Sequence, residues 1–283
     1  MSDGPRTIDV RHLGRPSVIA CFQQGSVLVD PGPDVCSPML FAALGDEAPE
    51  AVLLTHIHLD HAGATGAVVR RWPHVKVVVH ERGAPHVVDP SKLVASATRL
   101  YGDDMARLWG EIVPVPAENL IVVGDDDRID GFGGPWRVAY TPGHASHHVA
   151  YLHEPSGTLF AGDVAGVRIG YGPVLPPTPP PDIDVERWHA SVELLRGWDA
   201  ERVALTHFGV FDDVAAHFDE LLTTLDELSA VARRTDADGY AELIRGIVRR
   251  GGDAEYADAM LQASPPETLW HGLDRYWSRR AGG

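Results

Sequence analysis

The sequence predicts an α/β protein that continues into a helical C-terminal part. Short apolar segments rich in Val, Leu and Ala recur through residues 1–211 and are typical of buried strands. From residue 212 onward, apolar residues instead recur at helical spacing. Four of the predicted strands each end in a His or Asp, at the position where loops over a rigid sheet usually carry function.

The first predicted elements form a sheet. Residues 17–22 and 26–30 are two short segments joined by a turn at 23–25 that ends in glycine, which is typical of a β-hairpin. Residues 51–54 (Ala-Val-Leu-Leu) and 75–79 (Val-Lys-Val-Val-Val) are two further buried strands.

Directly after the strand at 51–54 comes a dense group of metal-binding residue types. His56 and His58 share one side of an extended segment, and Asp60 and His61 lie just beyond its bend. Neutral imidazole and carboxylate oxygen are natural ligands for zinc, manganese or iron. Ordinary surface histidines packed this tightly would repel one another once protonated. The segment therefore predicts a metal site with room for two ions.

Three later strands end in the same way. Residues 136–141 lead through Pro-Gly to His144, residues 158–161 end in Gly-Asp163, and residues 202–206 end at His207. One such ending would be weak evidence, but four in one chain predict a shared site.

These motifs together resemble the metallo-β-lactamase superfamily over about residues 8–210. The similarity lies in His-x-His-x-Asp-His at 56–61, His144, Asp163, His207 and the early Leu-Val-Asp-Pro-Gly around Asp30. It implies an αββα sandwich with a dinuclear site in the cleft between two sheets. By this resemblance one metal is held by His56, His58 and His144, the other by Asp60, His61 and His207, and Asp163 bridges them.

The resemblance also suggests a role for Asp30. It would hold a ligand histidine through the second ring nitrogen, without binding metal itself. A plain turn residue before Pro31-Gly32 is the alternative for Asp30.

Two divalent ions about 3.5–4 Å apart lower the pKa of a bridging water, so that hydroxide exists near neutral pH. That hydroxide would attack an electrophilic carbonyl or phosphoryl centre. Asp60 is placed by sequence to shuttle the proton as well as to bind metal. Two Zn²⁺ ions are the expected cofactors, with Mn²⁺ or Fe²⁺ as alternatives.

Two irregular segments interrupt this pattern. In residues 81–116 apolar side chains recur at helical spacing, as a flap over the substrate pocket or as ordinary packing; we expect packing for most of them. The proline-rich residues 172–181 lie between Asp163 and His207, so we expect a stiff loop at the mouth of the site. Arg168 and Tyr171 at its start are weaker candidates for substrate contact, and a plain surface residue is an equal alternative for each.

The C-terminal part predicts helices over about 214–231, 238–250, 254–263 and from Pro266 onward. We expect residues 1–211 to form the core and residues 212–283 to pack on it, over the cleft or at the seam of a possible homodimer. Histidines outside the ligand set, such as His12 and His189, are expected to be ordinary, and His147 and His148 to support the site at most.

Composition restricts the function classes. A net charge of −16 argues against nucleic acid or an anionic membrane as a partner. The apolar runs are too short to span a bilayer, and residues 1–5 show no export signal, so we expect a cytoplasmic protein. Cys21 and Cys36 have neither metal nor redox spacing.

The expected function is hydrolysis of a small ester, lactone or thioester, because the resemblance is to the glyoxalase II and lactonase branch. Tyr171 follows Asp163 too distantly to match the tyrosine that lactonases place there, and no glutathione-binding positions are evident. A mononuclear iron dioxygenase acting on a persulfide remains an alternative. A non-catalytic binding module is a third possibility.

Overall fold

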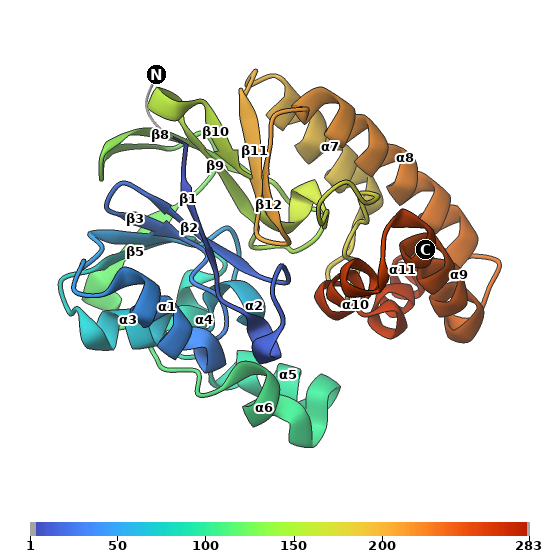
Figure 1. Ribbon diagram of the computed structural model, residues 1–283, viewed down its shortest axis with the longest axis horizontal. Helices are drawn as coiled ribbons and strands as arrows, with labels where there is room; N and C mark the ends of the chain where they lie inside the picture. The colour runs from blue at the N-terminus through green and yellow to red at the C-terminus, as the bar shows by residue number, and fades with distance from the viewer. Residues whose placement is uncertain (1–3, 282–283) are drawn as a thin grey trace.

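Two six-stranded sheets stack face to face with helices on their outer sides (Figure 1). The computed structural model describes residues 4–281. The expected α/β class and αββα sandwich are confirmed. The first sheet has the order β1-β2-β3-β4-β5-β6 and the second β12-β11-β10-β9-β8-β7. The strands are β1 (Arg6–Asp9), β2 (Ala20–Gln24), β3 (Val27–Val29), β4 (Ala51–Leu53), β5 (Lys76–His80), β6 (Leu120–Val123), β7 (Arg128–Gly131), β8 (Gly134–Tyr140), β9 (Val149–His153), β10 (Thr158–Phe160), β11 (Arg202–Leu205) and β12 (Gly209–Phe211).

Strand direction explains why the ligand candidates meet. β2 and β3 form the predicted antiparallel hairpin, with Phe22 opposite Val29. β3, β4, β5 and β6 then run parallel, as do β10 and β11 in the second sheet. Because parallel strands end at one edge of their sheet, the loops after them gather there.

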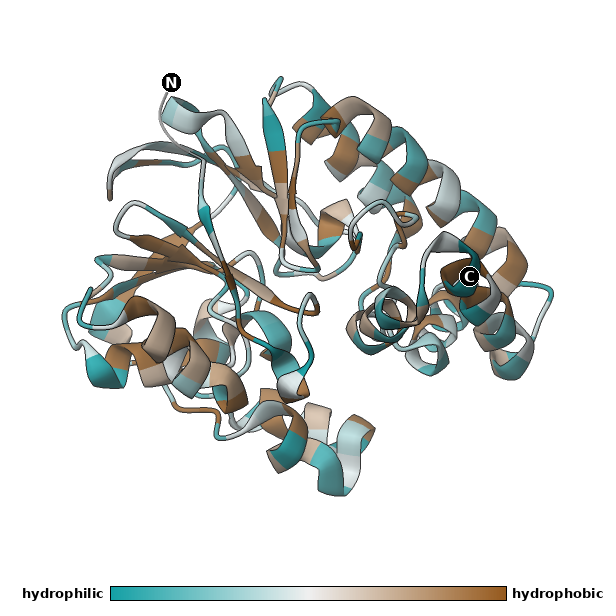
Figure 2. Cartoon of the chain, in the orientation of Figure 1, coloured by the Kyte–Doolittle hydropathy of each residue, from teal (hydrophilic) through white to brown (hydrophobic). Residues whose placement is uncertain are grey.

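Alternation along the strands forms the two layers of the core. In β3 and β4, Val27, Val29 and Leu53 pack between the sheets, whereas Leu28 and Val52 pack under the helices. Successive side chains of a strand point to opposite faces, so strands buried on both sides are apolar throughout. Figure 2 shows this concentration of apolar residues in the strands.

Helices cover both outer faces. In Figure 1, α1 and α3 lie outside the first sheet, and α7 and α8 outside the second. In the described residues, no helix is both long and apolar enough to cross a membrane. The helices are α1 (Ser37–Leu44), α2 (Leu59–Ala62), α3 (Thr65–Arg71), α4 (Ala84–Val88), α5 (Ser91–Tyr101), α6 (Met105–Trp109), α7 (Val185–Arg196), α8 (Val214–Ala232), α9 (Ala237–Gly251), α10 (Ala254–Ala263) and α11 (Pro266–Ala281).

The predicted C-terminal helices are present as α8 to α11. Asp236 and Asp253 cap α9 and α10 by accepting the backbone N–H of Gly239 and Tyr256. The indole of Trp277 on α11 donates to the backbone of α8 at Ser229, at 3.0 Å. The division into a core of residues 1–211 and an appendage of residues 212–283 stays a prediction.

Candidate metal centre

The structure brings all seven predicted ligand residues to one place at the edge of the sheets. They come from four loops that follow β4, β8, β10 and β11, together with α2 and the short helix η6 (Gly162–Ala165). Their side chains are buried, apart from His58 and Asp60, which are half-buried. The seven are His56, His58, Asp60, His61, His144, Asp163 and His207.

Three imidazoles form the first group. Nδ1 of His58 lies 3.0 Å from Nε2 of His56 and 3.0 Å from Nε2 of His144. Three nitrogens bound to one zinc ion at its usual distance and tetrahedral geometry are about 3.3 Å apart. The spacing of these nitrogens therefore suits a single metal ion.

A second group lies beside the first. Oδ2 of Asp60 is 3.4 Å from Nε2 of His207 and 4.0 Å from Nε2 of His61. The two oxygens of Asp163 face different groups, with Oδ1 3.2 Å from Nε2 of His61 and Oδ2 3.4 Å from Nε2 of His144. One carboxylate thus lies between the two sets of donors, as a bridging ligand would.

Hydrogen bonds at the far side of the rings fix their orientation. Nδ1 of His144 donates to the carbonyl of Pro177, and Nδ1 of His207 donates to the carbonyl of Val18, both at 2.8 Å. A carbonyl can only accept, so the proton sits on Nδ1 and the lone pair of Nε2 points into the group. Ligand histidines are typically held in this way.

Asp30 does the same for His61 through its side chain. Its buried carboxylate accepts a hydrogen bond from Nδ1 of His61 at 2.8 Å. It also accepts hydrogen bonds from the hydroxyls of Thr55 and Thr206, at 2.7 and 2.9 Å. The Thr55 hydroxyl is in turn 3.1 Å from Nδ1 of His56. Asp30 therefore contacts one ligand histidine directly and a second through Thr55.

The two groups differ in electrostatics. Burial lowers the pKa of His58 to about 4, with a further contribution from His144, so this side is a set of neutral donors. Burial alone would also lower the pKa of His61. However, Asp163, Asp30 and Asp60 surround that ring and raise its pKa well above the ordinary value. The second group therefore requires positive charge.

Two buried atoms show that a cation fits there. Nε2 of His61 and Oδ1 of Asp163 are buried, and neither has a hydrogen-bond partner in the part of the chain that the structure describes. Because Nδ1 of His61 donates to Asp30, the carboxylate oxygen of Asp163 faces Nε2, where a proton or a metal ion would balance its charge. Without a proton or a metal ion between them, the two atoms would repel at this distance. The donor set is thus suited to divalent metal ions.

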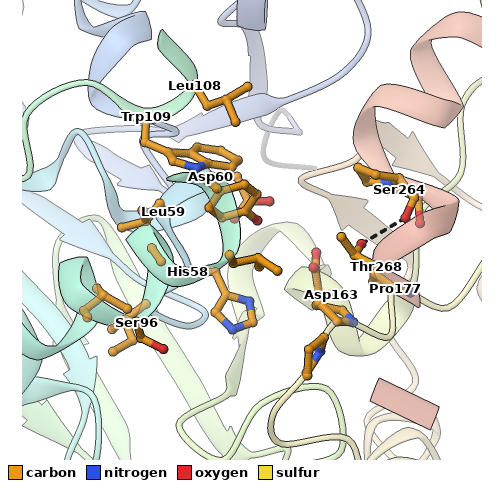
Figure 3. A pocket seen from close by; sticks show the side chains of 18 of the residues that line it. His58, Leu59, Asp60, Ser96, Leu108, Trp109, Asp163, Pro177, Ser264 and Thr268 are labelled. Atoms are coloured by element: carbon orange, nitrogen blue, oxygen red, sulfur yellow. Dashed lines mark hydrogen bonds between the residues drawn. The ribbon is translucent and has the colours of Figure 1, made fainter. Parts of the chain in front are cut away.

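The candidate ligands form the floor of a cavity of about 740 Å³. His58, Asp60, Asp163 and His207 line it (Figure 3). Pro177, which holds His144, is also part of its wall. The proline-rich segment is therefore a loop at the mouth of the site, as expected.

Arg168 and Tyr171 are not brought to this cavity, which corrects the expectation of substrate contact. Nη1 of Arg168 pairs with Asp213 at 2.9 Å, and its guanidinium lies 4.3 Å from the ring centre of Phe211. The backbone N–H of Arg168 donates to the carbonyl of His207 at 2.7 Å. Tyr171 is fully exposed to solvent.

The segment at 81–116 also departs from expectation. Most of the apolar side chains at helical spacing line the cavity, so that this part of the segment forms one wall of the pocket, whereas Ala84, Val87 and Val115 pack into the core. The cavity-lining members are Leu93, Ala97, Leu100, Tyr101, Leu108 and Trp109.

Three histidines outside the predicted ligand set, His12, His86 and His147, also line the cavity. His12 stacks on Trp109 with ring centres 5.4 Å apart, and its Nε2 lies 2.8 Å from the carbonyl of Leu108. No local pattern marks His12, because these contacts join segments far apart in the chain. His147 lies beside His56 and His58, with ring centres 6.1 and 5.6 Å away.

Comparison with known proteins identifies a family whose name agrees with the metal-binding geometry of the cluster. The family model described as the metallo-beta-lactamase superfamily matches residues 14–207. ST1585 of Sulfurisphaera tokodaii, a protein named for its metallo-beta-lactamase fold, is 28% identical over 195 residues, covering 68% of this chain and 72% of that protein. The hydroxyacylglutathione hydrolase of Aeromonas hydrophila is 31% identical over 171 residues, covering 60% of this chain and 51% of that enzyme. The chain thus spans about half the length of that hydrolase.

Solved structures show the same fold. The crystal structure of ST1585 from Sulfolobus tokodaii has a TM-score of 0.71 at 23% identity and covers 97% of this chain and 99% of its own. The crystal structure of TTHA1429 from Thermus thermophilus has a TM-score of 0.67 at 20% identity and covers 99% of this chain and 94% of its own. Both matches take in most of the C-terminal helices together with the sandwich.

Proposed function

The chain belongs to the metallo-beta-lactamase superfamily, and on that premise we propose that it is a dinuclear metal-dependent hydrolase of a small ester, lactone or thioester. The observation that carries this proposal is the placement of Asp163. Its two oxygens face His61 and His144, one from each group of donors. A single mononuclear site would not need a carboxylate shared between two histidine sets.

Each residue has a role in this proposal. His56, His58 and His144 would hold one ion, Asp60, His61 and His207 the other, and Asp163 both. We favour zinc, because imidazole and carboxylate in small, rigid groups suit it. When bound, such a pair of ions activates water as a nucleophile and polarises the carbonyl under attack.

Asp60 is the candidate proton carrier. Burial alone would raise the pKa of this carboxyl, but His61 and His207 outweigh that effect and lower its pKa, so that Asp60 is ionised. Its side chain is 25% exposed and lines the cavity. It can therefore accept a proton from the attacking water and return it to the leaving group.

Replacement of the bridging residue tests the proposal. Asp163→Asn keeps the shape of the side chain but removes its charge, so we expect loss of at least one metal ion and a fall in kcat of more than a hundredfold. His189→Ala is the control, because that half-buried histidine pairs with Asp226, outside the cluster. Metal content and hydrolysis of thioesters and lactones would be measured for both.

Asp163→Asn with two bound ions and full activity would contradict the proposal. One iron ion per chain together with oxygen consumption on a persulfide would replace it with the dioxygenase alternative. Two tightly bound ions with no turnover of any ester, lactone or thioester would favour the binding module.

A further inference from the structure

One face of α5 lines the cavity, although Leu93 also packs against the core and the ring centre of Tyr101 lies 5.1 Å from that of Trp109. Leu93, Ala97, Leu100 and Tyr101 follow one another at spacings of four, three and one residues, which places them on one side of the helix. No residue of α5 is buried, and Leu100 is 45% exposed. An apolar helix face of this kind normally packs into a core, so its position here indicates an apolar occupant of the cavity.

The wall on the other side is built by the C-terminal helices. Leu269 of α11 and the short link between α10 and α11 line the cavity, which Figure 3 shows at Ser264 and Thr268, facing Ser96, Leu108 and Trp109. The Thr178 hydroxyl of the proline-rich loop donates to the carbonyl of Leu269 at 2.8 Å, which fixes this wall to the loop that also holds His144.

Polar contacts hold the end of α10 against the N-terminal turn. Nε of Arg15 donates to Gln262 at 2.8 Å, and Nη1 of Arg15 pairs with Asp258 at 3.0 Å. The side chain of Gln262 donates to the carbonyl of His12 at 2.8 Å. The C-terminal helices are therefore fastened in place as a wall beside the metal centre.

We propose that this cavity takes a long, unbranched apolar acyl chain, so that the preferred substrate is a medium- or long-chain acyl ester or thioester. The inference rests on the proposed hydrolase function, which supplies the reaction at the cavity floor. A cavity of about 740 Å³ is larger than an acetyl or lactoyl group requires and lies within the range that encloses a molecule of drug size. The acyl carbonyl would lie over His58 and Asp163, and the chain would extend between α5 and α11.

Chain length gives the first test. The zinc-loaded protein would be assayed with acetyl, hexanoyl and decanoyl thioesters of one thiol. We expect kcat/KM to rise about fourfold for each added methylene that the cavity buries. Equal rates for all three chain lengths would overturn the inference and leave the hydrolase proposal intact.

A matched pair of variants on α5 locates the chain. Ala97 lines the cavity, whereas Ala95 is exposed and does not. Ala97→Glu places a carboxylate against the chain and should reduce the decanoyl-to-acetyl ratio of kcat/KM by tenfold or more. Ala95→Glu adds the same charge to the same helix and should leave this ratio unchanged. Equal ratios in the two variants would overturn the inference.

Direct binding separates failure of the inference from failure of the hydrolase proposal. If no ester, lactone or thioester is hydrolysed with both metal ions bound, the hydrolase proposal fails. Calorimetry with decanoate and acetate then decides the inference alone. Tighter binding of decanoate that is weakened by Ala97→Glu but not by Ala95→Glu supports it, and equal binding of the two acids overturns it.

Discussion

Oδ2 of Asp30 lies 2.8 Å from Nδ1 of His61, a contact that joins the loop after β3 to the helix that carries two candidate ligands. Asp30 adopts a left-handed backbone conformation with φ of 49°. Asp and Asn tolerate this conformation better than other residues with a Cβ. The position is thus suited to a short polar side chain that turns back to hold His61.

Asp30→Asn should weaken metal binding without preventing folding. The amide preserves the shape and tolerates the positive φ, but it removes the charge opposite His61. Loss of such a supporting contact typically costs tenfold to a hundredfold in metal affinity. Chelator competition would measure the affinity, with Asp226→Asn at an exposed site as control. Unchanged zinc affinity in Asp30→Asn would show that the contact does not support the site.

Gly162, next to Asp163, should not tolerate a side chain. A Cβ there would lie 2.5 Å from Oγ1 of Thr55 and 2.9 Å from Nε2 of His148, at a positive φ of 49°. Gly25 also has a positive φ, of 59°, but open space around it. Gly25→Ala should therefore cost about 1–2 kcal/mol of unfolding free energy from backbone strain alone, and Gly162→Ala roughly 1–3 kcal/mol more from crowding.

Urea denaturation of both glycine variants would measure this difference. If Gly162→Ala were no less stable than Gly25→Ala, the close packing of this loop against Thr55 would be wrong.

Arg168 should affect stability and not substrate binding. Its guanidinium pairs with Asp213 and lies over Phe211, and its backbone holds the segment of His207. We expect Arg168→Ala to lower the unfolding free energy by roughly 1 kcal/mol, with KM unchanged. Steady-state kinetics and urea denaturation would check this. A severalfold rise in KM with unchanged stability would instead indicate that Arg168 contacts the substrate.

Stability should fall on acidification, in part through His217. Its Nε2 donates to the carbonyl of Ala165 at 2.7 Å, and burial lowers its pKa below the ordinary 6.5. The folded state therefore keeps this ring neutral at a pH where the unfolded chain binds a proton. Below pH of about 6.5 the unfolding free energy should decrease, by at most roughly 1.4 kcal/mol per pH unit from this residue, until the pH reaches the folded-state pKa.

His217→Gln keeps a donor toward Ala165 but cannot titrate. Unfolding free energies between pH 7.5 and 5 should depend less on pH in this variant than in the parent protein. His189→Gln, at a half-buried histidine that pairs with Asp226 away from Ala165, is the matched control. An identical slope in His217→Gln and the parent would contradict the assigned cause.

Much of the fold was predictable because local patterns determine it. The segment 51–54 is apolar at every position and 75–79 at every position but Lys76, which is typical of strands buried on both faces, as β4 and β5 largely are. The C-terminal helices carry regular apolar stripes, and α9 and α10 begin at the aspartates that cap them. Three of the four strand-end motifs follow β8, β10 and β11, which run in one direction in the second sheet. The fourth follows β4 of the first sheet, so that their meeting also depends on how the two sheets stack.

The cavity could not be predicted in the same way. An amphipathic helix such as α5 has the same sequence pattern whether its apolar face packs on a core or lines a pocket. The sequence therefore does not indicate that the side chain of Leu100 is exposed. The hydrogen bonds that orient His144 and His207 come from the backbone carbonyls of Pro177 and Val18, which every residue type has. The pairing of Arg168 with Asp213 could not be predicted either, because Asp213 lies in a later segment of the chain.

Elemental analysis of the protein purified without added metal is the most direct test of the dinuclear site. We expect about two divalent ions per chain in the parent protein, fewer in Asp163→Asn, and two again in His189→Ala. Two ions per chain that persist in Asp163→Asn, or a single ion in the parent protein that excess zinc does not raise to two, would contradict the site described above.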